Sequence, residues 1–511
     1  MLFDNYFISE LRNRPTTDVV LIDNGREITV SEVIRRSTQL AQNLSNQGLT
    51  AQSHVILAVA PSIDFLLILY ANMLLRTTVA IIDPEMGREN YQQKIQSFGP
   101  DWAFVDSRLL LLQEHPLVRW LYLRLSKNGP YVPYLRTAKI VATGPWMPLV
   151  QRHIKLKKLH AATAKISDLQ PAETADLQAD FLVTYTSGTL SEPKGVVHTL
   201  ASLTESVRIL SAYLQPAKDQ ILATHLPHYM LIGLNAGVKV NLWNVKWSPE
   251  RRIEFIEQHG ITMLMGPPCE YLELMDWCKQ QGRMFPTSLQ HVFIGSAPVH
   301  SAFLQKLVVL APKMRITSLY GMTENLMVAC IDGQQKLTFD GQGDIVGRTF
   351  PNIEIRIADD DEIMLKSPQL FKQYLHFPPR PAWHATGDLG KITSDGSLVL
   401  TGRKKDMIIR RNMNIYPGLY EPTINKIPNI IEAVMVGVYS EDLHDEVVYL
   451  IVESDKQLSA SNIMSALTTG KYSIDKEALP DQIIFQQLPR KGRQSKVDKN
   501  EIRTSIAQQL A

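Results

Sequence analysis

Short, strongly apolar segments alternate with helical patterns along much of the chain, and this alternation constrains the fold more than any other feature. The runs HVILAVA (residues 54–60) and TVAIIDP (78–84) predict strands, and SIDFLLILYANMLL between them predicts a helix. Strands that are apolar throughout are typical of parallel sheets covered by helices on both faces. The pattern recurs with further predicted strands in WAFVD, FLVTYTS, ITMLMG, QHVFIG and RITSLYG. The sequence therefore predicts an α/β fold with layered, largely parallel sheets.

The pattern changes near residues 352–402. NIEIRIADDDEIMLKS and GSLVLTGR predict hairpin-like strands joined by tight turns, which indicates a small β-subdomain.

With 511 residues, the chain is long enough for two or three domains and a large buried core.

Composition excludes several classes of protein. A net charge of +2 gives no general attraction to nucleic acid. The three cysteines (Cys269, Cys278 and Cys330) make no disulfide framework, lack metal-ligand spacing and suit a reducing compartment. Acidic residues in the first 15 positions argue against a secretory signal, and Pro61 and Asp64 interrupt the most apolar segment, which argues against a membrane span. We therefore expect a cytoplasmic protein.

One region departs from the nearly even numbers of acidic and basic residues in the whole chain. Residues 116–167 contain no Asp or Glu, and nine Lys or Arg lie between Arg119 and Lys158 among several aromatic residues. Two interpretations are open, a solvated basic surface and a surface for anionic lipid or an acidic protein. The second predicts peripheral membrane contact through residues 119–158.

The segment YTSGTLSEPKGVVHT (185–199) follows directly on a predicted strand. Small residues, hydroxyls and a lysine suit phosphate, because backbone N–H groups can approach its oxygens closely. The segment is not a Walker A loop: counted from Gly188, Pro193 stands at the second glycine and Gly195 at the magnesium-binding hydroxyl. The residues alone leave a phosphate-binding loop and a polar surface turn as alternatives.

Four further segments carry residues suited to nucleotide chemistry, although each alone also fits a surface turn. They are SLYGMTE (318–324), ATGDLG (385–390), TGRKKDMIIRRNMNIYP (401–417) and LPRKGRQSKVDK (488–499). With the loop at 185–199, and in this order, they resemble the acyl-adenylate-forming (AMP-binding) superfamily, which includes acyl-CoA synthetases, luciferases and peptide-synthetase adenylation domains. The resemblance covers roughly residues 20–505.

The resemblance implies two domains. Residues 1–403 would form an N-terminal AMP-binding domain of two α/β layered sheets plus the small β-subdomain. Residues 404–511 would form a small, mobile α+β C-terminal domain with its hinge at Lys405. The family's small domain rotates after adenylation, so that a catalytic lysine leaves and a thiol such as CoA enters.

The resemblance also implies roles for individual residues. Lys496 is the expected mobile lysine, which bridges the substrate carboxylate and the α-phosphate of ATP; without the family it would be an ordinary solvated lysine. Thr323 would contact the α-phosphate, Glu324 with Thr189 would hold Mg²⁺, and His228 would gate the carboxylate or simply be a core histidine. Tyr320 would stack on adenine and Asp388 would accept both ribose hydroxyls. The full implied ATP- and AMP-binding set is Thr186, Ser187, Gly188, Thr189, Lys194, Gly295, Ser296, Ala297, Tyr320, Gly321, Met322, Asp388 and Arg403.

The chain departs from the family pattern in three segments. Leu190 and Ser191 replace a threonine and a glycine of the phosphate loop, and Ser495 replaces the glycine that usually precedes the lysine. Arg411 and Asn412 stand where glycines are common, in a region that helps form the path of the thiol. We expect adenylation to survive these changes, whereas they leave the CoA step open.

The acid and its acceptor are less constrained. No aspartate lies between His225 and Val240, where amino-acid-activating relatives carry one, so an uncharged fatty acyl chain fits better. The expected reaction is ATP-dependent formation of acyl-AMP, followed by transfer to CoA or an acyl carrier protein, with ATP, Mg²⁺ and CoA as cofactors. Residues 81–112 resemble the β-lactone synthetase branch, which predicts a β-hydroxy fatty acid substrate as an alternative. A non-catalytic acyl- or nucleotide-binding partner is the third alternative.

Overall fold

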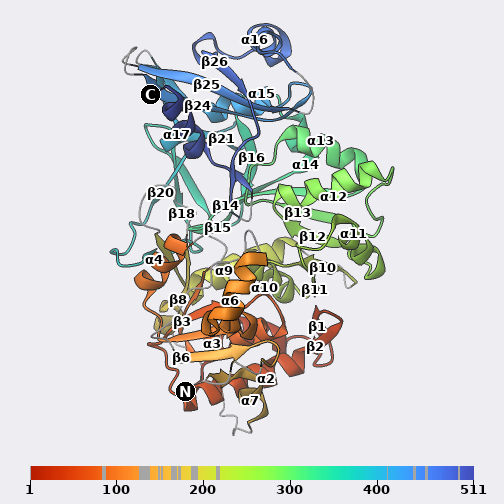
Figure 1. Cartoon of the computed structure of the whole chain (residues 1–511), viewed down its shortest axis with the longest axis vertical. Coiled ribbons are helices and arrows are strands. Elements are labelled where there is room, and N and C mark those ends of the chain that lie inside the picture. The colour runs from red at the N-terminus through yellow and green to blue at the C-terminus, as the bar shows by residue number, and fades with distance from the viewer. Residues whose placement is uncertain are drawn as a thin grey trace. The chain divides into compact units, whose positions relative to one another are not determined.

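Figure 1 shows the computed structural model of the chain, coloured from the N-terminus to the C-terminus. The contacts within the chain divide it into two compact units. The first comprises Met1–Val245, Thr323–Leu326 and Pro368–Arg380, and the second comprises Lys246–Met322, Met327–Ser367 and Pro381–Ala511. The structure describes residues 2–82, 88–125, 139–147, 150, 153–162, 170, 174–185, 194–214, 219–410, 413–440, 445–454, 458–492 and 495–510.

An eight-stranded sheet forms the centre of the first unit. Its strands, in spatial order, are β19 (Gln373–Tyr374), β9 (Gly195–Thr199), β8 (Asp180–Tyr185), β4 (Thr78–Ile81), β3 (His54–Ala58), β5 (Trp102–Asp106), β6 (Lys139–Thr143) and β7 (Ile154–Lys155). The pairs from β8 to β7 are parallel, as predicted, whereas β9 is antiparallel to both β8 and β19. The same unit holds a run of four further strands, β10 (Ile221–Thr224), β11 (Lys239–Leu242), β1 (Val19–Asp23) and β2 (Arg26–Thr29).

The helices of the first unit follow from local sequence signals. Thr29 and Glu32 form a capping box that starts α2, and Ser62 caps the first turn of α3. Every residue of α3 except Asp64 is buried, as expected for the apolar run after β3. The helices are α1 (Tyr6–Arg12), α2 (Val30–Asn46), α3 (Ile63–Leu75), α4 (Arg88–Phe98), α5 (Ser107–Glu114), α6 (Pro116–Leu125), α7 (Leu156–Ala161), α8 (Thr174–Leu177), α9 (Leu200–Leu214) and α10 (Pro227–Asn235).

A nine-stranded run forms the larger sheet of the second unit. Its order is β17 (Glu354–Ile357), β18 (Glu362–Lys366), β20 (His384–Ile392), β21 (Leu398–Arg403), β16 (Asp344–Thr349), β15 (Asn325–Asp332), β14 (Arg315–Met322), β13 (His291–Ile294) and β12 (Met263–Gly266). β12, β13 and β14 are parallel, and β17, β18, β20 and β21 are antiparallel neighbours, as the hairpin pattern predicts. The accompanying helices are α11 (Pro249–Gln258), α12 (Pro268–Gln280), α13 (Ser301–Leu310) and α14 (Gly333–Thr338).

The C-terminal part of the second unit has its own small core. β24 (Ile430–Ser440) pairs antiparallel with β25 (Asp445–Ser454), which pairs parallel with β26 (Gln482–Phe485). Side chains alternate between two faces, because Ala433 and Met435 join one apolar cluster while Val434 and Val436 join another. Helices α15 (Pro417–Ile424) and α16 (Ala460–Thr468) contribute to the first cluster, and α17 (Lys499–Leu510) contributes to the second.

The remaining elements of this part are short. They are the strands β22 (Ile408–Arg410), β23 (Met413–Ile415), β27 (Arg490–Lys491) and β28 (Lys496–Val497), and the 3₁₀ helices η2 (Lys404–Asp406), η3 (Gly470–Tyr472) and η4 (Lys476–Ala478). The predicted α/β class is thus confirmed. Residues on both sides of the predicted 403/404 boundary belong to the second unit, and the division there stays a prediction. Among the described residues, no helix combines the length and apolarity that crossing a membrane requires.

Candidate active site

A buried aspartate joins a tyrosine and an arginine in the second unit, and we call these three residues the Asp388 cluster. Tyr320 Oη donates a hydrogen bond to Asp388 Oδ2 at 2.7 Å, and Arg403 Nε lies 2.7 Å from Asp388 Oδ1. Asp388 and Arg403 are direct partners in the β20–β21 hairpin, so their pairing follows from strand register. Asp388 is only 3% exposed. A carboxylate has about four lone-pair sites, so each oxygen of Asp388 can still accept a hydrogen bond from a hydroxyl group of a ligand.

Electrostatics fix the protonation states of this cluster. Burial raises the pKa of Tyr320, and the negative charge of Asp388 raises it further. The same aspartate raises the pKa of Arg403. Tyr320 therefore stays a hydrogen-bond donor and Arg403 stays a cation at any physiological pH. The cluster therefore presents the charges of Asp388 and Arg403 and the hydroxyl dipole of Tyr320 near Lys496.

Lys496 lies beside this cluster, on the hairpin formed by β27 and β28. Its pKa is lowered, first by desolvation and then by the positive charge of Arg403 and Lys405, while Asp388 opposes the shift. The residue keeps access to solvent, so the desolvation of its ammonium is incomplete. Lys405 itself lies in η2, directly after β21. The structure therefore brings together the predicted ribose-binding aspartate, catalytic lysine and hinge lysine.

The loop after β13 carries Gly295, Ser296 and Ala297, three members of the predicted ATP- and AMP-binding set. Gly295 N donates to Gly266 O at 3.3 Å, and a Cβ at position 295 would lie 3.1 Å from Leu319 O. Ser296 has a φ of +67°, in the left-handed region that non-glycine residues seldom adopt. Gly321 and Met322 are the last residues of β14, the strand that carries Tyr320. The carboxyl ends of the parallel strands β12, β13 and β14 thus approach one another closely at the predicted ATP- and AMP-binding residues.

In the first unit, the predicted residues Lys194, Thr323 and Glu324 lie with two further residues, and we call the five the Glu324 group: Lys194, Thr323, Glu324, Tyr374 and His198. Tyr374 Oη donates to Glu324 Oε1 at 2.8 Å, and Lys194 Nζ lies 5.3 Å from the centroid of the Tyr374 ring. His198 Nε2 donates to the Thr323 carbonyl oxygen at 2.8 Å. Burial lowers the pKa of His198, so this imidazole is neutral and donates from Nε2.

Sequence reasoning did not find Tyr374 or His198. Tyr374 lies on β19, which pairs with β9 directly after the predicted phosphate loop. Burial and Glu324 both raise the pKa of Tyr374, which keeps its hydroxyl protonated. Fifty residues separate Tyr374 from Glu324, and no spacing in the sequence signals their contact.

The Glu324 group suits a magnesium ion that arrives with a nucleotide. Mg²⁺ in phosphate-binding sites is commonly held by one or two carboxylates together with the phosphates themselves. Glu324, which accepts a hydrogen bond from Tyr374, would supply one such carboxylate. Within the part of the chain that the structure describes, no group of three or more His, Cys, Asp or Glu could hold a metal alone.

His228 lies on α10 in the same unit. Its ring centroid is 4.1 Å from that of Tyr229. Burial lowers its pKa to about 4, with a smaller contribution from His225. His228 is therefore neutral near pH 7 and available as a hydrogen-bonding group, while its role as a gate stays a prediction.

Several predicted residues lie outside the described part of the chain. They are Thr186, Ser187, Gly188 and Thr189 of the phosphate loop, with Leu190 and Ser191 of the same loop, and Arg411 and Asn412 of the predicted thiol path.

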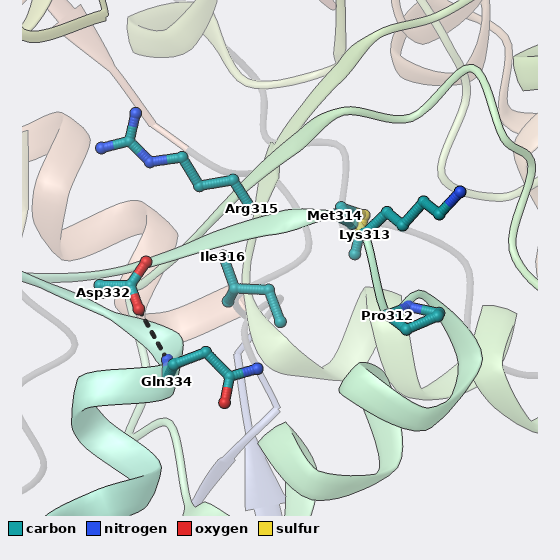
Figure 2. Close-up of a pocket in the computed structure, with 7 residues that line it drawn as sticks. All are labelled: Pro312, Lys313, Met314, Arg315, Ile316, Asp332 and Gln334. Carbon is teal, nitrogen blue, oxygen red and sulfur yellow. Dashed lines mark hydrogen bonds between the residues drawn. The ribbon is translucent and has the colours of Figure 1, made fainter.

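A pocket lies at the opposite end of β14 from Tyr320 (Figure 2). Asp332 Oδ1 accepts a hydrogen bond from the backbone N–H of Gln334 at 2.8 Å at its rim. None of the predicted site residues lines it, so we assign it no part in the reaction. Its lining consists of Pro312, Lys313, Met314, Arg315, Ile316, Asp332 and Gln334.

Comparison with solved structures identifies the fold. O-Succinylbenzoate CoA synthetase (MenE) from Bacillus subtilis, solved with the acyl-adenylate intermediate OSB-AMP, superposes with a TM-score of 0.75 at 18% identity, over 98% of each chain. The same enzyme solved with ATP and a magnesium ion gives a TM-score of 0.74 at 19% identity, over 95% of this chain and 96% of that one. Identities this low show a shared fold.

Curated relatives are named as CoA ligases acting on different acids. Indoleacetate–CoA ligase from Aromatoleum aromaticum is 29% identical over 361 residues, covering 65% of this chain and 68% of the relative. Long-chain-fatty-acid–CoA ligase FadD13 from Mycobacterium tuberculosis is 23% identical over 344 residues, covering 63% and 67%. Other relatives are matched over as little as 57% of their own length. The model of the AMP-binding enzyme family matches residues 9–375, more than half of the chain. The chain therefore belongs to the AMP-binding enzyme family.

Proposed function

We propose that this chain activates a fatty carboxylic acid as acyl-AMP, with release of pyrophosphate, and then transfers the acyl group to CoA or an acyl carrier protein. The observation that carries the proposal is the Asp388 cluster with Lys496 beside it. A free carboxylate is a poor acyl donor, because its charge repels nucleophiles and its oxygen leaves badly. Linking it to AMP supplies a good leaving group.

The second-unit residues suit the adenylation step. Asp388 accepts the ribose hydroxyls, and Arg403, held against it, places positive charge near the α-phosphate. The Lys496 ammonium contacts both the attacking carboxylate and the α-phosphate, and so offsets the repulsion between two anions. Such catalysis is mostly positioning and electrostatic stabilisation, since phosphoryl chemistry needs little covalent help from the protein.

The Glu324 group suits the phosphates that leave. Lys194 supplies positive charge to the β- and γ-phosphates, and Thr323 contacts the α-phosphate. Glu324 would hold Mg²⁺, which offsets charge between phosphate oxygens when it is bound. MenE solved with ATP and magnesium supports this choice of cofactors by analogy of fold.

A fatty acyl chain is the acid we propose. No acidic residue lies along residues 226–238 to pair with an amino group, and FadD13 is named for a long-chain fatty acid. The methionines Met230, Met263 and Met265 are buried, which makes each of them part of the apolar packing of its own unit. The relative named for indoleacetate makes aryl acids the main competing class.

ATP–pyrophosphate exchange with a panel of fatty, β-hydroxy fatty and aryl acids tests the proposal. We expect exchange that depends on a fatty acid and on Mg²⁺. Mass spectrometry of the products with and without CoA or a carrier protein then identifies the acceptor. A β-lactone formed without any thiol would establish the second candidate, which rests on the resemblance of residues 81–112. Absence of exchange with every acid would instead favour a non-catalytic binding protein.

We further propose that helix α6 contacts anionic lipid. Leu117, Trp120 and Leu121 are 76%, 51% and 51% exposed, and their i, i+3, i+4 spacing places them along one side of the helix. Arg124, one turn further, lies 4.4 Å above the Trp120 ring. Residues 116–167 contain no Asp or Glu, so no negative side chain of this segment repels a negatively charged surface.

Co-sedimentation with phosphatidylglycerol and phosphatidylcholine vesicles tests this contact. We expect binding to phosphatidylglycerol that falls with salt and with Trp120→Glu. Met284→Glu is the matched control, because Met284 is also 51% exposed and lies elsewhere in the chain. Equal sedimentation of both variants and the unchanged protein would contradict the proposal.

A further inference from the structure

We propose that His300, Glu432 and Arg490 form an ion-pair chain that holds the Lys496 hairpin in its adenylating position. The inference rests on the proposed function, because it assigns these residues to positioning the lysine that function requires. His300 precedes α13, Glu432 lies on β24, and Arg490 lies on β27. None of the three was singled out by the sequence analysis.

The strongest link in this chain is a two-pronged arginine contact. Arg490 Nη1 lies 2.7 Å from Glu432 Oε2, and Arg490 Nη2 lies 2.8 Å from Glu453 Oε2. Glu432 and Glu453 are direct partners across the β24–β25 ladder, so one guanidinium bridges two adjacent carboxylates. The planar guanidinium matches such an arrangement, and charge-assisted bonds of this kind are stronger than neutral ones.

Arg490 is coupled to Lys496 through the shortest hairpin of the unit. β27 and β28 are two residues long each, and their partners are Arg490↔Val497 and Lys491↔Lys496. Asp498 N also donates to Pro489 O at 2.8 Å. The side chain of Arg490 anchors this hairpin to the β24–β25 sheet, together with the apolar packing of Leu488 and Val497 against the same sheet.

His300 extends the ion-pair chain across the predicted domain boundary. Its Nε2 lies 3.6 Å from Glu432 Oε1. His300 belongs to the predicted N-terminal domain, whereas Glu432, Arg490 and Lys496 belong to the predicted C-terminal domain. Rotation of the smaller domain would therefore have to break the His300–Glu432 pair. We call the three residues His300, Glu432 and Arg490 the latch, because together they would hold the adenylating arrangement.

The charges around His300 make the latch dependent on pH. Burial alone would lower the pKa of His300, but Glu432 on β24, with Asp344 on β16 and Glu421 on α15, raises it. Lys336 pairs with Asp344 and Lys499 pairs with Glu421, which moderates both contributions. Burial alone would raise the pKa of Glu432, but His300 and Arg490 lower it to about 2.

The sign of the pH effect follows from these directions. A histidine whose pKa is raised by folding stabilises the arrangement fully below its unfolded pKa of about 6.5. That contribution is lost as pH rises through the higher pKa of the folded state. The His300–Glu432 pair should therefore act at mildly acidic pH and fade toward pH 9, while the Arg490 contacts persist.

The first test measures ATP–pyrophosphate exchange of the full chain from pH 6 to pH 9. We expect His300→Gln to slow exchange about two- to fivefold at pH 6, the range for a partly exposed ion pair, and to approach the unchanged protein at pH 9. Arg490→Met should slow exchange about tenfold at every pH. Arg283→Met is the matched control, because it removes a surface pair with Glu257 in the same unit.

The second test does not depend on activity. The side chain of Ser495 lies near the Cys269 thiol. With oxidised glutathione as the oxidant, a Ser495→Cys variant should therefore form a disulfide with Cys269 when the hairpin is in place. We expect His300→Gln and Arg490→Met to slow disulfide formation in that variant at pH 6, relative to the parent at the same pH. Cys269→Ser should abolish the cross-link.

The two tests separate failure of the latch from failure of the function. If Lys496→Ala abolishes exchange while His300→Gln and Arg490→Met match the unchanged protein at all pH values, the latch is wrong and the function stands. If no acid supports exchange, the proposed function fails, and the disulfide rates alone decide whether the latch exists. Equal disulfide rates in the Ser495→Cys parent and in its His300→Gln and Arg490→Met forms would overturn it.

Discussion

The Asp388 cluster and the Glu324 group hold their polar side chains by different means. In the Asp388 cluster an anion and a cation are paired, and the aspartate is almost fully buried. In the Glu324 group the contacts are hydrogen bonds from neutral donors, a tyrosine hydroxyl and an imidazole. Among the described residues, Glu324 has no ion-pair partner. The charge of Glu324 is thus not paired within the described residues, whereas the charge of Asp388 is paired with Arg403.

This difference suggests how the two groups divide the work. A pre-paired, buried cluster costs no reorganisation when a ribose arrives, and it keeps its charges at any physiological pH. A group held by neutral donors is complete only when metal and phosphates bring their own charges. Under the proposed function, the Asp388 cluster would be a preorganised site for the nucleoside, and the Glu324 group would be completed by the metal and phosphates that bind to it.

The largest expected effect is on the chemical step. Lys496→Ala should lower fatty-acid-dependent ATP–pyrophosphate exchange about 100- to 1,000-fold, because it removes a positive charge aimed at the transition state. ATP affinity should change less than about threefold. Lys499→Ala, which breaks a pair with Glu421, is the control. Undiminished exchange in Lys496→Ala would show that another group neutralises the carboxylate.

Asp388→Asn should separate binding from chemistry. It removes the charge that holds Tyr320 and Arg403, and we expect ATP affinity, measured by equilibrium binding, to fall about 10- to 100-fold. Asp395→Asn is the control, since Asp395 lies exposed in the turn of the same β20–β21 hairpin. Comparable losses in both variants would contradict a specific role for Asp388.

The neutral histidines of the first unit predict an acid-sensitive stability. The unfolded chain protonates His228 at about 6.5, whereas folding lowers its pKa to about 4, so its burial costs stability as pH falls between these values. His228→Gln should remove up to about 2 kcal/mol of that loss, seen as a flatter dependence of the urea midpoint on pH. An unchanged slope would place the acid sensitivity elsewhere.

Tyr374→Phe should have the smallest effect. Losing one hydrogen bond to Glu324 should raise the Mg²⁺ concentration for half-maximal exchange about fivefold, with little change in ATP affinity at saturating metal. Tyr439→Phe, at an exposed tyrosine, controls for loss of a hydroxyl. A change in ATP affinity without a change in metal dependence would place Glu324 outside the metal site.

Local patterns predicted the fold because the apolar residues that become buried follow each other in short segments of the sequence. The apolar run at residues 54–75 becomes β3 and α3, and the turn-rich segments near 352–402 become antiparallel hairpins. Asp388 and Arg403 also lie within one hairpin, so their pairing follows from register. These features depend on neighbours close in sequence.

Contacts between distant segments could not be predicted in this way. Tyr374 reaches Glu324 only because a two-residue strand adds to the edge beside β9. His300, Glu432 and Arg490 come from three separate elements, and their types are ordinary for solvated loops and strands. The roles of Lys496 and Glu324 came from family resemblance, since a lone lysine or glutamate carries no periodicity.

The central claim is that this chain joins a fatty acid to AMP before any thiol is involved. Single-turnover incubation of the purified protein with ATP, Mg²⁺ and a fatty acid, without CoA, followed by acid quench and mass spectrometry, tests it most directly. The account predicts acyl-AMP in amounts approaching the enzyme concentration, and none from Lys496→Ala. Bound, unreacted ATP in the unchanged protein with every acid tried would contradict it.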